Sequence, residues 1–200
     1  MFSGIVTACG RIEHILPLED GIRITVAPGD LDLADIKIGD SIAHDGVCLT
    51  VIAREDRKLV YDVSRETLNC TVGLNISGKE VNLEKAMAAN DRFGGHMVSG
   101  HVDGVGEVLK FEPVGESHEL MIRAPKALAG YIARKGSITV NGVSLTVNTV
   151  DKTDFSINLI PHTVEVTTLK HLKPGSRVNL EVDLIARYVE RMLAWKEEQS

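Results

Sequence analysis

A thiol and a hydroxyl occupy matching places in two nearly identical segments of this chain. Cys48 lies in GVCLTV, and Ser144 lies in GVSLTV, 96 residues further on. Both side chains become nucleophiles once a neighbouring base or a favourable environment activates them. A lone cysteine is more often a buried structural residue, and a serine in a strand needs no special role. The pair therefore indicates a reaction site only if other reactive groups accompany it.

Groups that can transfer protons stand at three further positions in the second half of the chain. At the same offset, the first half has Ile5, Gly39 and Ala86 where the second half has His101, Lys135 and Asp183, the last after a one-residue insertion. Histidine, lysine and aspartate serve as general acids and bases. Taken singly, His101 is most simply a surface histidine or a buried histidine whose ring nitrogens are hydrogen-bonded. The pattern predicts two similar pockets with unequal polar groups, and it specifies no reaction.

These positions match because the chain repeats itself. MFSGIVTACGRI (1–12) aligns with MVSGHVDGVGEV (97–108), and SIAHDGVCLTV (41–51) aligns with SITVNGVSLTV (137–147). VNLE also occurs twice, at 81–84 and 178–181. We expect two copies of one unit at 1–96 and 97–183, followed by a tail at 184–200. The glycine-rich segment GGHMVSGHVDGVG (94–106) is then the place where the fold restarts.

Each copy reads mostly as strand, which predicts an all-β fold with a small closed barrel in each half. β-Branched residues alternate with polar ones in four segments of each copy: 23–27, 47–53, 58–63 and 80–84, then 119–124, 143–150, 155–160 and 177–182. Asp45-Gly46 and Asn141-Gly142 are hairpin-turn signals. A short helix is expected over 125–136, where Pro125 would begin it and Gly136 would end it.

The tail has a different pattern and no counterpart after the first copy. Ile185, Tyr188, Val189, Met192 and Trp195 recur at three- and four-residue spacing, which predicts an amphipathic helix. Its apolar stripe could pack on the chain's own barrel or pair with copies of itself. The pattern does not decide between them.

Composition excludes several classes of protein. The net charge of −6 and the scattered Lys and Arg residues argue against nucleic acid as a partner. No apolar run is long enough to span a membrane, and no signal peptide is evident, so we expect a cytoplasmic protein. The three cysteines are far apart and form neither a metal knuckle nor a disulfide framework.

Two motifs that suggest ligand binding are rejected. GLNISGKE (73–80) fits a phosphate loop, but Glu80 replaces the required Ser or Thr, and a strand follows where a helix is needed. His96 and His101 are five residues apart, a spacing that points them in different directions on a strand or a helix. No metal site is therefore expected.

Several motifs together resemble one family. MFSGIV, SIAHDGVCLTV, GGHMVSGHVDG, KGSITVNGVSLTV and NLIPHTVEVTTL are similar to the alpha chains of riboflavin synthases, and the resemblance covers the whole chain, tail included. It implies two tandem six-stranded Greek-key β-barrels that each bind a lumazine, and a C-terminal helix that holds a homotrimer together. The active site would form between the N-terminal barrel of one subunit and the C-terminal barrel of its neighbour.

The resemblance also implies a reaction, the last step of riboflavin biosynthesis. One molecule of 6,7-dimethyl-8-ribityllumazine transfers a four-carbon unit to a second, which gives riboflavin and 5-amino-6-(D-ribitylamino)uracil. No metal or redox cofactor takes part. Association with a lumazine synthase is a further partner that the sequence leaves open.

Substrate-binding residues are carried over from the family motifs. The first pocket is expected to contain Gly4, Ile5, Val6, Cys48, Leu49 and Thr50, with the loop Asp62, Val63, Ser64, Arg65, Glu66 and Thr67. The second is expected to contain Gly100, His101, Val102, Lys135, Ser144, Leu145 and Thr146, with the loop Leu159, Ile160, Pro161, His162, Thr163 and Val164. Ser41 and Asp183 complete the set.

Catalytic roles follow from the same resemblance. His101 and Thr146 are expected to assist proton transfer, while Ser144 and Cys48 serve as nucleophiles or hydrogen-bond partners. Asn141 stands where more relatives have aspartate; if a carboxylate acts there as a base, the amide weakens that role, and the turn interpretation holds either way. Relatives also often have threonine in place of Ser3.

Two rival functions remain. Lumazine-binding antenna proteins share the duplicated barrels and catalyse nothing, but their midpoint segment departs from GGHMVSGH, which this chain keeps. A flavin-dependent reductase would need a nicotinamide-binding unit, and the sequence has none.

Overall fold

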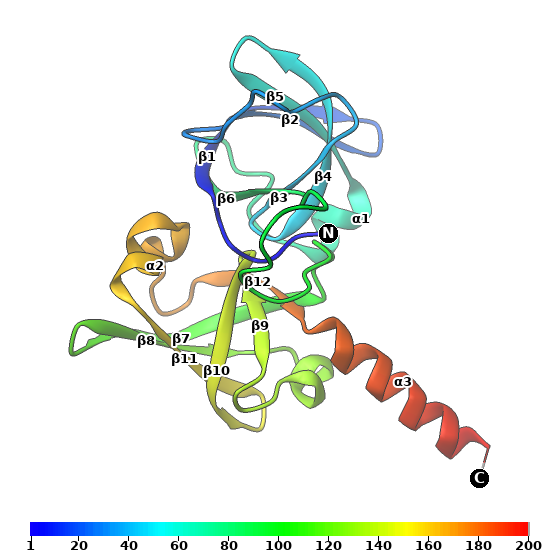
Figure 1. Ribbon diagram of the computed structural model, residues 1–200, viewed down its shortest axis with the longest axis vertical. Helices are drawn as coiled ribbons and strands as arrows, with labels where there is room; N and C mark the ends of the chain where they lie inside the picture. The colour runs from blue at the N-terminus through cyan, green and yellow to red at the C-terminus, as the bar shows by residue number, and fades with distance from the viewer. Residues whose placement is uncertain (200) are drawn as a thin grey trace.

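The computed structural model describes residues 1–199 and contains two closed six-stranded β-barrels (Figure 1). The first barrel comprises β1 (Ala8–Leu18), β2 (Gly21–Ala27), β3 (Ser41–His44), β4 (Val47–Glu55), β5 (Lys58–Ser64) and β6 (Glu80–Lys85), with helix α1 (Arg65–Cys70) after β5. The second comprises β7 (Gly104–Val114), β8 (Ser117–Arg123), β9 (Ser137–Val140), β10 (Val143–Asp151), β11 (Asp154–Leu159) and β12 (Arg177–Val182). Short helices η1 (Lys126–Tyr131), α2 (Pro161–Val166) and η2 (Thr168–His171) accompany it, and α3 (Leu184–Glu198) ends the chain.

The strand order is that of a Greek key and is the same in both barrels. The first barrel closes in the order β1-β2-β5-β4-β3-β6, and the second closes with β7 to β12 in the equivalent places. Strands β3, β4 and β5 follow one another as hairpins, and β6 returns beside β3, which is the Greek-key connection. The predicted all-β class, the duplication and the closed barrels are confirmed.

Strand alternation builds the two cores and leaves the reactive residues outside them. In β4, Val47, Leu49 and Val51 are buried in the core of the first barrel, while Cys48 and Thr50 between them are more exposed. Side chains along a strand point alternately to its two faces. The apolar residues of GVCLTV therefore fix the strand, and this fixes the outward direction of the thiol and the hydroxyl.

The predicted hairpin turns are confirmed. Asp45 and Gly46 have φ values of 46° and 83°, and Asn141 and Gly142 have values of 47° and 78°, as a two-residue type I′ turn requires. The helix expected over 125–136 is shorter and is a 3-10 helix at Lys126–Tyr131. Only six residues separate Pro125 from the extended backbone of Ile132, which leaves no room for an α-helix of several turns.

The two barrels are joined by a pair of buried asparagines, one from each VNLE motif. Asn82 Nδ2 donates to the carbonyl oxygen of Asn141 at 2.9 Å, and Asn179 Nδ2 donates to that of Asp45 at 3.0 Å. Each asparagine oxygen accepts a backbone N–H from a segment beyond the turns, Thr168 for Asn82 and Val72 for Asn179, both at 2.8 Å. The hairpin turns therefore meet at a joint that is nearly symmetric.

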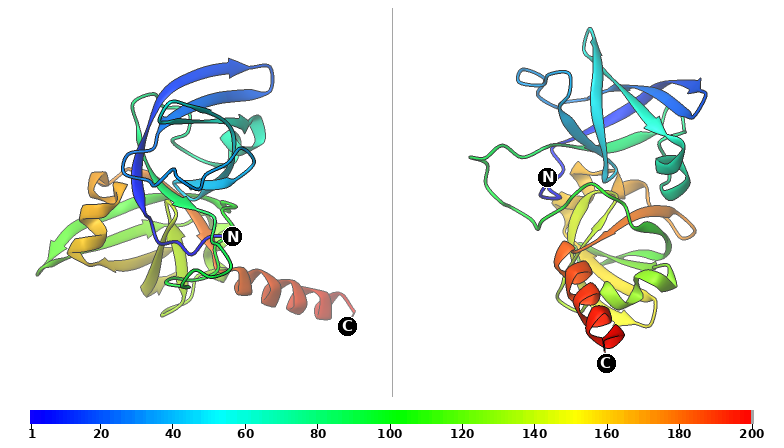
Figure 2. Two further views of the ribbon diagram at one scale, coloured as in Figure 1. Left: turned by 45° about the horizontal axis from the view of Figure 1, so that its top comes forward. Right: turned by 90° about the vertical axis from the view of Figure 1, so that its right-hand side faces the viewer.

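Helix α3 extends away from the second barrel (Figure 1 and the left view of Figure 2). None of its described residues is buried, and its apolar stripe is exposed, with Tyr188 66% and Met192 72% accessible. Near its start, Arg187 forms an ion pair with Asp103, and Glu190 accepts a hydrogen bond from Tyr131. The chain's own barrels do not cover the stripe. Within residues 1–199, no helix has both the length and the apolar character needed to cross a membrane.

A buried histidine in the first barrel predicts loss of stability in mild acid. His44 Nδ1 lies 3.1 Å from the carbonyl oxygen of Ile42, its ring lies edge-on to Tyr61, and Nε2 is buried without a partner among the described residues. Burial lowers the pKa of His44 to about 4. Between pH 6.5 and about 4, the unfolded chain binds a proton that the folded chain does not. This should cost up to about 3 kcal/mol of folding free energy as pH falls through that window.

The matched variant is His44→Leu, which replaces the titrating ring with an apolar side chain. The equivalent position of the second barrel is also apolar, the fully buried Val140. Denaturant unfolding of both proteins from pH 7 to pH 4 should show a shallower fall in stability for His44→Leu. Parallel curves for the two proteins would contradict this role of His44.

Candidate active site

Each barrel presents two outward polar side chains on its fourth strand. Cys48 and Thr50 point outward from β4, and Ser41 on β3 lies opposite Thr50. Ser144 and Thr146 occupy the same places on β10. The reactive groups predicted from the two related motifs therefore lie on corresponding faces of the two barrels, one set per barrel.

The segments that precede each barrel are exchanged, and this corrects the predicted pockets. The carbonyl oxygen of Gly4 accepts the N–H of Ser144 at 2.8 Å, and that of Gly100 accepts the N–H of Cys48 at 2.9 Å. Gly4–Val6 therefore belong with Ser144 and not with Cys48. Gly100–Val102 belong with Cys48 for the same reason. The prediction paired each segment with its own half because sequence order was the only guide.

Side-chain packing shows the same exchange. Val6 packs against the core of the second barrel, and Val102 packs against the core of the first. A Cβ atom on Gly4 would lie 2.6 Å from Cβ of Ser144, and one on Gly100 would lie 2.6 Å from Cβ of Cys48. Both glycines also have φ near +77°, at 76° and 78°. The glycine of the Ser-Gly dipeptide in each repeat is thus required for this close approach.

Two glutamates that the sequence did not single out hold these segments in place. Glu84 accepts hydrogen bonds from Ser3 N, Ser3 Oγ and Gly4 N at 2.7, 2.7 and 2.9 Å. Glu181 does the same for Ser99 and Gly100. Burial raises the pKa of Glu84, although the hydrogen bonds from Ser3 and Gly4 oppose this. The sequence did contain a signal for these two residues, because each glutamate is the last residue of a repeated VNLE motif.

The two predicted loops are strand ends that run into helices. Asp62–Ser64 end β5 and Arg65–Thr67 begin α1, where Ser64 accepts the N–H of Thr67. Leu159 ends β11, and Pro161–Val164 belong to α2. Since β4 pairs with β5 and β10 pairs with β11, both segments lie beside the outward polar residues of their own barrel.

Several predicted binding residues can offer a ligand little more than backbone. Leu49, Val63 and Leu159 are buried in the barrel cores. Asp62 pairs with Arg23, and this ion pair lowers the pKa of its carboxyl group. The polar groups that remain for a ligand are concentrated around Cys48 and around Ser144.

The surroundings of Cys48 and Ser144 are unlike. Cys48 lies against an apolar cluster formed by Phe2, Ala43, Ala86 and Val98. Ser144 Oγ lies 2.7 Å from Nδ1 of His96, a residue that was not among the predicted site residues. The thiol therefore faces apolar groups, and the hydroxyl faces an acid–base group.

The other predicted acid–base residues are placed by backbone contacts and by a helix cap. His101 is exposed and follows Gly100, so it lies on the Cys48 side and apart from Thr146 within one chain. Lys135 donates its N–H to the carbonyl oxygen of Val147 at 2.8 Å and has a φ of 67°. Asp183 caps α3 by accepting the N–H of Ile185.

Asn141 belongs to the joint between the barrels. Its Oδ1 accepts the N–H of Asn179 at 2.8 Å, and its carbonyl oxygen accepts from Asn82. The residue is 6% exposed. These contacts support the turn interpretation of Asn141.

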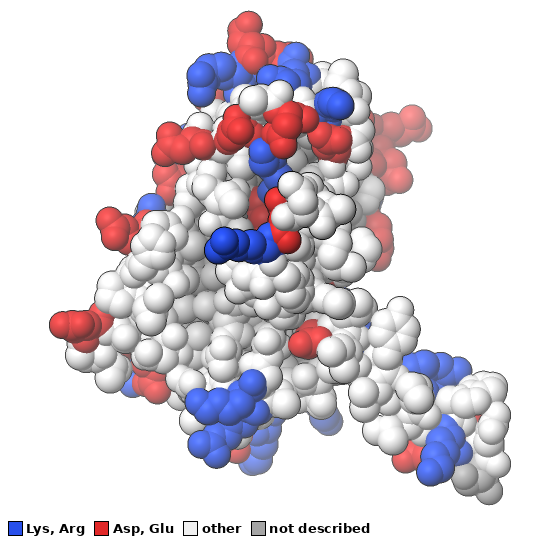
Figure 3. Space-filling model, viewed as in Figure 1, with Lys and Arg blue, Asp and Glu red and all other residues white. Residues whose placement is uncertain are grey.

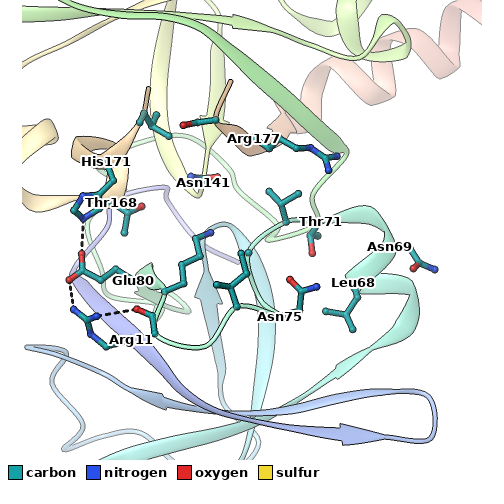
Figure 4. A pocket seen from close by; sticks show the side chains of 17 residues that line it. Arg11, Leu68, Asn69, Thr71, Asn75, Glu80, Asn141, Thr168, His171 and Arg177 are labelled. Carbon is teal, nitrogen blue, oxygen red and sulfur yellow. Dashed lines mark hydrogen bonds and ion pairs between the residues drawn. The ribbon is translucent and has the colours of Figure 1, made fainter. Parts of the chain in front are cut away.

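A cavity of about 920 Å³ lies between the barrels, and none of the outward strand residues is among those that line it (Figure 4). Arg11 pairs with Glu80, which also accepts from His171, and Arg177 and Asn141 lie across from them. Asn141 is the one predicted site residue among those that line it. Its other lining residues come from α1, from the segment between α1 and β6, and from the turns around η2 and β12.

Charge is unevenly placed on the surface. Figure 3 shows acidic and basic side chains spread over the first barrel and basic ones at the lower edge of the second, while the face of the second barrel between them is largely uncharged. Among residues 1–199, no three His, Cys, Asp or Glu side chains are grouped as metal ligands would be.

Comparison with known proteins identifies the family. The lumazine binding domain matches this chain twice, at residues 3–86 and 99–183. Riboflavin synthase of Photobacterium phosphoreum is 48% identical over 194 residues, which cover 96% of this chain and 89% of that protein. Riboflavin synthases of Bacillus subtilis (strain 168) and Brucella abortus (strain 2308) are 41% and 39% identical, covering 96% and 98% of this chain and 90% and 100% of theirs.

Solved structures resemble the fold at lower identity. LumP complexed with 6,7-dimethyl-8-(1'-D-ribityl) lumazine has a TM-score of 0.81 and 27% identity, and LumP complexed with riboflavin has a TM-score of 0.83 and 28% identity. Each alignment covers 91% of this chain and 99% of LumP. With two matched domains and full-length relatives at 39–48% identity, the chain belongs to the lumazine-binding riboflavin synthase family.

Proposed function

We propose that this chain catalyses the riboflavin synthase reaction, in which one lumazine molecule transfers a four-carbon unit to a second, identical molecule. The observation that carries the proposal is the pair of corresponding but unlike surfaces around Cys48 and Ser144. Two copies of one substrate need two similar binding sites. One copy must act as donor and the other as acceptor, so the sites must also differ chemically.

Backbone and side-chain groups on each surface suit a flat heterocycle. Gly100–Val102 and the end of β5 flank Cys48 and Thr50, and Gly4–Val6 and the start of α2 flank Ser144 and Thr146. The edge of a lumazine alternates hydrogen-bond donors and acceptors, which exposed main-chain groups and hydroxyls can match. Holding two rings face to face can by itself lower the barrier by roughly 7–11 kcal/mol.

Lys135 has an unusual backbone that supports a functional role. Its φ of 67° lies in the left-handed region, where the first repeat has Gly39 with a φ of 96°. A lysine in this conformation is strained, and strained residues concentrate at functional sites. We therefore assign Lys135 to the second site, where its charge would stabilise negative charge that develops on a bound ring.

The C-terminal helix supports a trimer. Its exposed stripe includes Ile185, Tyr188, Val189 and Met192, and an uncovered apolar face of this kind is stabilised by association. In a trimer, the Cys48 surface of one subunit would meet the Ser144 surface of its neighbour, and His101 and Thr146 would then share one site. Sedimentation velocity should show a trimer for the full chain and a monomer for a Val189→Glu, Met192→Glu variant. A full-chain monomer would contradict the assembly.

The cysteines agree with a reducing compartment. Cys9, Cys48 and Cys70 are all free thiols, and such thiols persist in the cytoplasm. We propose a cytoplasmic location on this basis.

A conversion assay separates the enzyme from an antenna protein. The purified chain is incubated with 6,7-dimethyl-8-ribityllumazine, and riboflavin absorbance is followed. We expect steady formation of riboflavin with release of the pyrimidinedione in equal amount. Tight lumazine binding without conversion would instead favour a light-harvesting role like that of a pure binding protein.

A further inference from the structure

His96 is placed to act on Ser144. Its ring Nδ1 lies 2.7 Å from Ser144 Oγ, and its backbone N–H donates to the carbonyl oxygen of Ser3 at 3.1 Å. The residue is only 8% exposed, and Nε2 is buried with no partner in the part of the chain that the structure describes. A buried ring with one unpaired nitrogen calls for an explanation, and the contact of the other nitrogen with Ser144 suggests one for His96.

Among the described residues, the contact is present in one barrel only. His96 lies in the segment that joins the two copies, directly before the repeat restarts at Met97. Cys48, the counterpart of Ser144, contacts the apolar cluster instead. The His96–Ser144 pair is therefore the sharpest chemical difference between the two otherwise matching surfaces.

We propose that His96 acts through Ser144 as its general base, so that the serine of the second barrel is the activated nucleophile of the reaction. This inference rests on the proposed function. The 2.7 Å contact is a hydrogen bond through which the hydroxyl proton can pass. A serine alcohol is a weak nucleophile until an adjacent base removes its proton.

The environment suits a base at neutral pH. Burial lowers the pKa of His96, so the ring is neutral at pH 7 and can accept a proton. The negative charge of Asp183 opposes this shift and would stabilise the imidazolium once it forms. Among the described residues, Asp183 is the charged group whose field acts on His96.

The step balances without a further reactant. Ser144 Oγ forms a bond to an electrophilic carbon of one lumazine ring, and its proton moves to Nδ1 of His96. The carbon–nitrogen π bond breaks, and its electron pair passes to the ring nitrogen, where the pyrimidinedione delocalises the charge. When the serine later leaves as the rings join and fragment, His96 returns the proton.

A merely structural histidine would give different kinetics. His96→Gln keeps a side chain that can hydrogen-bond to Ser144 but cannot titrate. We expect it to lower kcat at least 10-fold at pH 7.5, with KM changed less than threefold. The acidic limb of the kcat–pH profile should change, because His96 no longer contributes its protonation to it. His14→Gln, at an exposed position on β1, is the matched control and should leave kcat unchanged.

A double variant tests whether His96 acts through Ser144. Once the hydroxyl is absent, the base has nothing to activate, so Ser144→Ala with His96→Gln should be no slower than Ser144→Ala alone. Circular dichroism and thermal unfolding confirm that each variant is folded.

Three outcomes would overturn the inference alone, provided the wild-type chain converts lumazine. These are a His96→Gln variant with kcat within twofold of wild type, an unchanged acidic limb, or losses that multiply in the double variant. A wild-type chain that binds lumazine and forms no riboflavin would overturn the proposed function instead.

Discussion

Replacing Ser144 with alanine is expected to lower kcat about 100-fold and to change the affinity for lumazine less than threefold. The hydroxyl is one polar atom on the rim of the second site, and Gly4 still binds the backbone N–H of residue 144. The binding surface therefore persists. The lost group is the one that His96 contacts, and acid–base or nucleophilic groups of this kind contribute about 10²–10⁴-fold to rates. Steady-state kinetics and fluorescence titration with lumazine measure the two quantities.

Ser156→Ala provides the control for this substitution. Ser156 is buried in β11, its hydroxyl forms a hydrogen bond with that of Thr149 at 2.6 Å, and it is not one of the predicted site residues. It should lose about 1 kcal/mol of stability and keep its turnover. If Ser144→Ala turned over as fast as Ser156→Ala, the hydroxyl would have no part in the chemistry.

Replacing Asn179 with alanine should lower the free energy of unfolding by about 2–4 kcal/mol. Its amide donates to the carbonyl oxygens of Asp45 and Val72 and accepts the N–H of Val72 at 2.8 Å. The alanine would leave these buried backbone groups unpaired at the joint, and each such group costs about 1–3 kcal/mol. Denaturant unfolding measures the change.

The exposed Asn158 of β11 offers a matched comparison, because it has no hydrogen bond from its side chain among the described residues. Asn158→Ala should stay within about 0.5 kcal/mol of wild type. Equal stability of the two variants would mean that the asparagine pair does not hold the barrels together.

Most of the fold could be predicted from local sequence patterns. Alternation in GVCLTV and GVSLTV placed Cys48 and Ser144 on strands, and the positive φ of Asp45 and Asn141 follows from the Asp-Gly and Asn-Gly pairs. The repeat itself predicted two barrels of one topology. These features depend on neighbours within a few residues, and such neighbours are visible in any single sequence.

Contacts between the two halves of the chain could not be predicted from local patterns. Gly4 meets Ser144 across 140 residues, and Gly100 meets Cys48 across 52. No periodicity encodes which of two similar strands a segment approaches. The glycines of the two Ser-Gly dipeptides did indicate a close approach, but only the structure shows the strand that each one approaches.

His96 was overlooked for a related reason. Its spacing to His101 excluded a shared metal, and it had no aligned counterpart in the first half. After duplication and divergence, the groups that differ between the copies are the ones that can give the two sites different chemistry. Ser144 and His96 are 48 residues apart and meet only because the restart segment crosses the second barrel.

The most direct test of the central idea is a calorimetric titration with a lumazine analogue that binds but does not react. Two binding events per chain are expected, with unequal affinities, and a substitution of Lys135 by alanine should weaken just one of them. A single binding event per chain, in protein shown to be fully folded, would mean that the twin surfaces do not hold a pair of substrates.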